Sequence, residues 1–283
     1  MKTMNQKPNI YDYFKEENIS PQKVYKASKK YIPVYINPKL YEEIFQIKYE
    51  EKSAFKRISD LFSITLDHNK AKEEIGIGYA DKQEDPMGIS LSGNQGSGRA
   101  YFYGECFNIK GDKTSLATSP KPTYSNGKFA LPAAIKEAIT ANILAKELSI
   151  PTFETLAILD TTEYFEYINE FLAPDDSIQK EIVLLPSALE IRVNKEKQLY
   201  RVSSALINKD KLSLEKLKHL LDRLALIEAE KYNKRILHGS WSVGNISIDG
   251  NLIDFDTAYF VKERNPQYSN TNKYKSFFKF WSK

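Results

Sequence analysis

The segment HGSWSVGNISIDGNLIDFD, residues 238–256, contains the strongest local signal in the sequence. Asp249 and Gly250 form a dipeptide typical of a two-residue hairpin turn. With that turn, Asn245 lies directly opposite Asp254, and directly opposed residues have Cβ atoms about 4.5–5.5 Å apart. The other face of the predicted hairpin is apolar and consists of Ile246, Ile248, Ile253 and Phe255. The segment therefore predicts a carboxamide and a carboxylate side by side on an apolar support.

An amide oxygen and a carboxylate suit a hard divalent cation. Proteins usually hold Mg²⁺ with one or two carboxylates, and substrate phosphates and water complete the shell. Asn245 and Asp254 are therefore candidate ligands for Mg²⁺ or Mn²⁺. An ordinary surface hairpin with a polar end explains the spacing equally well, so the assignment depends on the rest of the chain.

The polar residues of this segment follow the order found in protein kinases. His238 and Asn245 have the spacing of the first and last residues of the kinase HRDxxxxN loop. Asp254 and the phenylalanine after it begin like the metal-binding DFG triplet, although Asp256 replaces its glycine. The order favours a nucleotide site over a surface hairpin.

Kinases also need a lysine on a strand for the phosphates and a helix glutamate that holds this lysine. Lys110 follows an aromatic and apolar stretch, residues 100–109, that predicts one strand. Glu137 lies in the first turns of a helix predicted over residues 132–148, with a proline at its start. Either charge alone is typical of a solvated surface, but in this order the two fit the kinase roles.

Further motifs occur in a fixed order along the chain. They are GSGRA at 96–100, GE at 104–105, IKGDKT at 109–114, YSNGK at 124–128, AAIKE at 133–137, SIPT at 149–152, HGSWSVGNISIDG at 238–250 and DF at 254–255. Over roughly residues 75–260, this series resembles the SelO family of kinase-like protein adenylyltransferases. Each match is partial, and the shared order is what makes the resemblance specific.

The resemblance implies an enzyme that transfers AMP from ATP to a hydroxyl group of a protein or peptide. It implies that Lys110 and Glu137 form the ion pair on the phosphates, and that Asn245 and Asp254 hold Mg²⁺ or Mn²⁺. The nucleotide-binding residues would be Gly96, Gly98, Arg99, Lys110 and Arg192. The two glycines belong to a loop that could cradle phosphates with its backbone N–H groups, although such loops are more often plain turns.

The chain departs from the family at the catalytic base, where Gly244 stands in place of aspartate. General-base catalysis typically contributes ~10²–10⁴-fold to a rate. Its loss predicts a slow enzyme, a substitute base or a pseudoenzyme. Asp256 and His238 are the nearest substitutes, although a histidine at this position is more often structural.

The expected fold is α+β, with the two lobes of a protein kinase. The predicted parts are an N-terminal arm over 1–30, a sheet-rich N-lobe over 31–172 and a small, mainly helical C-lobe over 173–283. Residues 172–174 are the predicted hinge, and residues 152–173 are expected to form a strand, a turn and a short helix. A helix over 212–232 is predicted to pack the C-lobe core with Leu214, Leu217, Leu221, Leu224 and Ile227.

Composition sets broad limits on partners and location. The 283 residues include 41 Lys+Arg and 37 Asp+Glu, and this mild excess does not require nucleic acid as a partner. With Cys106 as the sole cysteine, no internal disulfide forms, and no run of about 18 apolar residues predicts a membrane span. A cytoplasmic protein is expected. Its basic, aromatic C-terminal tail either packs on the domain or contacts a partner or a membrane surface.

The leading functional hypothesis is the SelO-like nucleotidyltransferase. A catalytically impaired pseudoenzyme that acts as a nucleotide-binding or scaffold module is the first alternative. A kinase that transfers the γ-phosphate is another, and so is a kinase-like transferase acting in a biosynthetic pathway.

Overall fold

The computed structural model describes residues 19–81, 98–104, 106–115, 126–147, 152–172, 178–193, 202, 213–239, 241 and 243–260. These residues form an α+β fold, which confirms the predicted class. The strands are β1 (Ile19–Ala27), β2 (Ile32–Ile36), β3 (Ile64–Thr65), β4 (Ala71–Asp81), β5 (Ala100–Tyr103), β6 (Phe107–Lys110), β7 (Glu154–Leu172), β8 (Ile178–Val193), β9 (Ile236–Leu237) and β10 (Tyr259–Phe260). The α-helices are α1 (Pro38–Phe45), α2 (Glu51–Phe62), α3 (Leu131–Glu147) and α5 (Leu214–Lys234), and the 3₁₀ turns are η3 (His68–Lys70) and η4 (Val243–Asn245).

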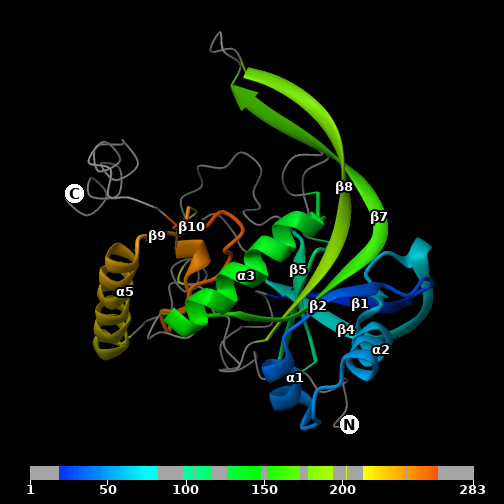
Figure 1. Cartoon of the computed structure of the whole chain (residues 1–283), viewed down its shortest axis with the longest axis horizontal. Coiled ribbons are helices and arrows are strands. Elements are labelled where there is room, and N and C mark those ends of the chain that lie inside the picture. Colours follow the sequence, from blue (N-terminus) through cyan, green and yellow to red (C-terminus); the bar gives the residue numbers. More distant parts are fainter. Residues whose placement is uncertain are drawn as a thin grey trace.

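Eight strands form one curled antiparallel sheet in the order β2-β7-β8-β6-β5-β4-β1-β3 (Figure 1). Helices α1 and α2 belong to the large apolar core on one face, which includes Leu40, Ile58 and Ile109. Helix α3 packs against β7 and β8 on the other side of the sheet. The sheet is therefore apolar beneath α1 and α2, and α3 is placed over its second face.

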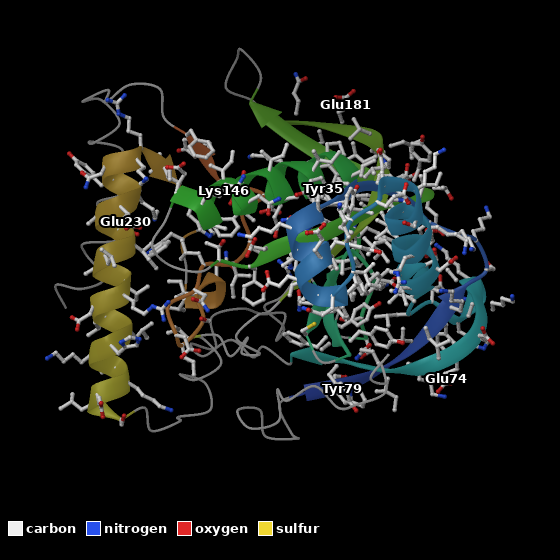
Figure 2. The ribbon with its side chains drawn as sticks, turned by 60° about the horizontal axis from the view of Figure 1, so that its bottom comes forward. Tyr35, Glu74, Tyr79, Lys146, Glu181 and Glu230 are labelled. Atoms are coloured by element: carbon white, nitrogen blue, oxygen red, sulfur yellow. The ribbon has the colours of Figure 1, made fainter. Side chains whose placement is uncertain are left out.

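Helix α3 also connects the sheet to the C-terminal part of the chain. Ala141 and Leu144, in its second half, share a buried cluster with Ile227 of α5 and with Phe255. Figure 2 shows Lys146, near the end of α3, between Glu230 of α5 and the sheet. Because α3 packs both against the sheet and against this cluster, residues 243–258 lie near the sheet face that α3 covers.

The aromatic stretch predicted as one strand is a hairpin of two. Tyr103 of β5 pairs with Phe107 of β6, and Gly104 adopts φ +68° in the turn between them. Glycine reaches this left-handed region without steric cost. The prediction of one strand was wrong because a single glycine reverses the chain within an otherwise strand-like sequence.

The predicted strand, turn and short helix over 152–173 are instead one long strand, β7. The hinge predicted at 172–174 follows a residue of the sheet, because Leu172 pairs with Ile178, and residues 173 and 174 lie outside the described part of the chain. Strand β8 then continues through the same sheet, beside β6. The predicted lobe boundary at residue 172 therefore falls inside the sheet.

The predicted N-terminal arm over 1–30 needs a similar correction. Strand β1 pairs with β4 over its whole length, and Val24 is fully buried. Residues 19–27 are therefore part of the sheet, and residues 1–18 lie outside the described part of the chain.

The predicted C-lobe helix exists as α5, and of its predicted core series only Leu224 and Ile227 belong to a core cluster. Leu214 is 83% exposed, and Leu217 and Leu221 are about 40% exposed, whereas Leu220 and Ile227 are buried. The apolar period had predicted which side chains share a face. It could not predict whether another element covers that face.

No described helix has both the length and the apolar character that a membrane crossing needs.

The contrast between the exposed Leu214 and the buried Ile227 of α5 allows a direct test of how this helix packs. We expect Ile227→Ala to lower the free energy of unfolding by about 2–5 kcal/mol, because it leaves a cavity in the cluster shared with α3. Leu214→Ala should change it by no more than about 0.5 kcal/mol, because the side chain is mostly in water. Urea titrations of both variants provide the measurement. Equal losses would show that α5 is packed differently.

Candidate functional site

The sheet face beneath α3 carries four buried polar side chains from two neighbouring strands. Asn108 of β6 lies opposite Arg192 of β8, and Lys110 lies opposite Glu190. All four side chains are at most 3% exposed. Because side chains alternate along a strand, the intervening Ile109 points to the opposite, apolar core. The two strands thus combine an apolar face with a buried charged face.

Lys110 lies at the centre of this charged face. Its ammonium Nζ is 2.5 Å from Oε2 of Glu137 and 2.5 Å from Oδ1 of Asp254. The side chains of Lys110 and Glu137 are each 2% exposed, and that of Asp254 is 25% exposed. The structure therefore brings together three residues that the sequence had assigned to one site, from β6, α3 and the C-terminal segment.

Arg192 contacts the same two carboxylates. Its Nη1 is 3.0 Å from Oε1 of Glu137 and 3.2 Å from Oδ1 of Asp254, and its Nε and Nη2 donate to Oδ1 of Asn108. Its side chain is 2% exposed. Arg192 was predicted to bind the nucleotide. Its burial and its protein partners instead make it a bridge that holds Glu137 and Asp254 in place.

Glu190 completes the buried group and had no place in the sequence-based site. Its Oε1 accepts a hydrogen bond from the Thr155 hydroxyl at 2.6 Å, and its Oε2 has no partner within the described residues. Burial, followed by the nearby Glu137 charge, raises the pKa of Glu190 to about 8. At neutral pH Glu190 is therefore mostly protonated, and the charges of Lys110, Arg192, Glu137 and Asp254 cancel.

A second ion pair lies beside the first. Nη2 of Arg99 is 3.1 Å from Oδ2 of Asp256, and both side chains are partly exposed. The Phe129 ring contacts two cations, with the Arg99 guanidinium 4.6 Å and the Lys110 ammonium 4.3 Å from its centroid. Asp256, a candidate substitute base, is thus tied to Arg99. Of the cationic groups expected on the phosphates, Arg99 is the most accessible.

His238 is a structural residue in this arrangement. Its Nε2 lies 2.9 Å from the Ile253 carbonyl oxygen, to which it donates, and its ring packs near Phe255 and Trp241. Burial, and then the charge of Lys231, lowers the pKa of His238 to about 4. A buried, neutral imidazole that donates to the backbone fits the structural role rather than that of a substitute base.

The hairpin of residues 238–256 has a different register from the predicted one. Ile246 bridges Leu252, and the Ile253 N–H donates to the Asn245 carbonyl at 3.0 Å. Asn245 is therefore opposite Ile253 and not Asp254. The cause is a three-residue loop that ends at Gly250 with φ +80°, in place of the predicted two-residue turn. A consequence is that Ile248 is only half-buried.

Asp254 itself has an unusual backbone. Its φ is +66°, a left-handed conformation that few residues other than glycine adopt and in which aspartate is enriched. Such conformations persist where the surrounding structure holds them and are common at functional sites. Here the two cations on its carboxylate hold Asp254 in place.

The donor set near Asp254 fits a cation held largely by a nucleotide. The described residues contain no group of three or more His, Cys, Asp or Glu side chains placed to hold a metal ion. Asn245 is a half-buried amide and Asp254 a partly exposed carboxylate on adjoining segments, but the observed register does not place them directly opposite each other as predicted. With phosphate oxygens and water as the other ligands, this set suits Mg²⁺.

The expected phosphate loop is described at one position only. Gly96 lies outside the described residues. The Gly98 carbonyl accepts hydrogen bonds from the N–H and the hydroxyl of Thr114, at 2.9 Å each. These contacts attach the end of the loop to the segment after β6.

Comparison with known proteins gives no family assignment: no family model matches the chain, and no curated protein matches its sequence. The SelO-like reading thus stays a prediction from the motifs.

The Glu190 pKa predicts a pH dependence of stability. Unfolded, this carboxyl has its ordinary pKa of 4.5, and folded it has a pKa of about 8, so between these values only the folded state keeps the proton. Stability should therefore fall as pH rises from about 5 to 8, by on the order of a few kcal/mol, and level off above that range.

Glu190→Gln should remove this loss, because the amide resembles the neutral carboxyl and does not ionise. The measurement is urea unfolding of both proteins from pH 5 to 9, taken as the difference between them so that other groups cancel. Glu181→Gln, at an exposed site on the same strand, should leave the pH profile unchanged. A parallel profile for Glu190→Gln would mean that Glu190 is ionised in the folded protein.

Proposed function

We propose that this protein is a kinase-like nucleotidyltransferase that binds ATP with Mg²⁺ or Mn²⁺ and transfers AMP to a hydroxyl group of a protein or peptide. The observation that supports this proposal best is the contact of one buried lysine, Lys110, with both Glu137 and Asp254. Active kinases need the same kinds of residue in place: a strand lysine, a helix glutamate and a metal-binding aspartate.

The placement of each residue on the fold also supports the proposal. Lys110 ends a strand of an antiparallel sheet, Glu137 lies on a helix packed against that sheet, and Asp254 comes from a segment close to the end of the described chain. A surface salt bridge would not need three such distant segments. Their convergence is expected where a site is assembled between a sheet and a C-terminal subdomain.

The roles follow from the chemistry of the side chains. The Lys110 ammonium has three N–H donors; two serve Glu137 and Asp254, and one is left for a phosphate oxygen. Arg99, at the partly exposed side of the group, offers a second cation to the triphosphate. Asn245 and Asp254 would hold the divalent cation, which supplies charge neutralisation of the phosphates when bound. Transfer of a nucleotidyl group depends mainly on how the reactants are positioned and how the charge of the phosphates is stabilised. The absence of a catalytic base at position 244 is therefore less costly than it would be in other reactions.

The choice of AMP over phosphate rests on the motif series that resembles the SelO family. The γ-phosphate alternative uses the same residues with ATP held the other way round. Incubation with α-labelled and γ-labelled ATP separates the two, because AMP transfer leaves only the α label on the acceptor.

One observation favours a second candidate, a nucleotide-free scaffold. Lys110 is almost fully buried, and Oδ1 of Asp254 already has two cationic partners. With Gly244 at the position of the base, this self-contained network is also what a pseudoenzyme would need for a stable fold.

The two candidates differ in a binding measurement. With ATP and Mg²⁺ at ~100 times the dissociation constant, the fold should gain ~2.7 kcal/mol, seen as a rise in melting temperature. Asp254→Asn should abolish the metal-dependent part of this rise, because it removes the charge but keeps a residue type that tolerates the left-handed backbone.

The matched control is Lys56→Met, at an exposed lysine on α2, which should leave the rise intact, whereas Lys110→Met should remove it. The absence of any shift with ATP, with or without metal, would favour the scaffold over the enzyme.

A further inference from the structure

The outer parts of β7 and β8 form a long two-stranded arm, defined here as residues 164–172 and 178–186. Among the described residues, the pairing of β2 with β7 ends at Asp160 and that of β6 with β8 at Glu190. Within the arm, β7 and β8 pair only with each other. Figure 1 shows this arm curving away beyond the helices and the other strands.

A bulge in β7 at the base of the arm bends the strand and so sets the direction of the arm. Asp160 pairs with Ala188 and Tyr164 with Pro186, so three residues of β7 face one of β8 in a bulge. Thr162, within the bulge, has φ +61°, and its N–H donates to the Asp160 carboxylate at 2.7 Å. A β-branched residue rarely adopts this conformation. Bulges bend a strand and are often found where a strand is redirected for function.

One face of the arm carries apolar side chains that are exposed to water. Leu184 lies opposite Glu166 and Pro186 opposite Tyr164, which places these residues and Ile182 on one face. Tyr164 is 70% exposed, and Ile182 and Leu184 are each 66% exposed. A two-stranded hairpin gains little stability by itself in water, and clustered exposed apolar side chains indicate an interaction surface.

The edges and the charge of the arm indicate what kind of partner fits. Both strands have an outer edge with no strand paired to it in the described part, and such edges accept an added strand. The arm contains three acidic residues, Glu166, Glu170 and Glu181, and one basic residue, Lys180. Figure 2 shows Glu181 toward the outer end of the arm. Like charges disfavour pairing with the arm of a second copy, so a basic partner fits better.

We propose that this arm binds an extended segment of a partner polypeptide, rich in apolar and in lysine or arginine side chains, as an added β-strand. Its apolar side chains extend the face formed by Tyr164, Ile182 and Leu184, and the excess negative charge of the arm attracts its basic side chains. The inference is independent of the nucleotide site, because the arm contains none of the residues assigned to that site.

The test uses the full chain and a fluorescent peptide in which lysine alternates with valine. Titration followed by fluorescence anisotropy should show saturable binding that weakens with salt, as expected for a contact with a strong charge component. The double variant Ile182→Thr with Leu184→Thr should weaken binding at least tenfold while keeping strand-compatible residues. Leu214→Thr, at an equally exposed leucine on α5, should not change it.

Two further peptides separate strand addition from simple charge attraction. A peptide interrupted by pairs of adjacent prolines has no continuous row of N–H donors on either edge and should not bind. A glutamate–valine peptide should not bind either. The proposal is overturned by the absence of binding, by equal binding to the double variant, or by equal binding of the proline peptide. Dimers in sedimentation that the double variant abolishes would also overturn it and assign the arm to a second copy.

Discussion

Two buried cations, one buried carboxylate and one partly exposed carboxylate meet between the sheet and α3, and the buried charges must be matched for the fold to be stable. Lys110 and Arg192 both contact Glu137 and Asp254, so no charge in the group lacks an opposite neighbour. Removal of one member of a buried pair typically costs about 3–5 kcal/mol, because the remaining charge is left uncompensated. The network therefore restricts how β6, β8, α3 and the C-terminal segment can be arranged.

The small side chains on the buried side of α3 are explained by this charge network. The helix must approach the sheet closely enough for the Glu137 side chain to reach Lys110. Alanines at 134, 138 and 141 are buried, and their small side chains allow that approach. One helix turn further, Leu144 packs in the cluster that holds Phe255, next to Asp254. The same helix thus supplies one carboxylate and supports the segment that supplies the other.

The order of motifs along the chain was enough to predict that Lys110, Glu137 and Asp254 lie together, and the structure brings these three side chains into contact. That order was not enough to find Asn108 and Glu190 or to assign Arg192. Their positions depend on the pairing of β6 with β8, and strand register between distant segments is a tertiary property. A signal was present: Asn108 with Lys110, and Glu190 with Arg192, are polar pairs at two-residue spacing in apolar strands. The lobe boundary predicted near residue 172 is a different case. The sequence Ala-Pro-Asp-Asp after residue 172 is typical of a turn between paired strands as well as of a linker between lobes, so the sequence alone could not distinguish the two.

The charge balance of the network also bears on why a divalent cation belongs to the proposed function. With Glu190 mostly protonated, the charges of Lys110, Arg192, Glu137 and Asp254 cancel and leave no excess positive charge to attract a triphosphate. Arg99 adds one cation, but Asp256 offsets it. The described site can therefore orient phosphates through the Lys110 and Arg99 donors, while most of the neutralising charge must come with the nucleotide. In the proposed function, a metal ion that arrives with the phosphates would meet this need, and the partly exposed carboxylate of Asp254 lies beside Lys110 as an oxygen ligand for it.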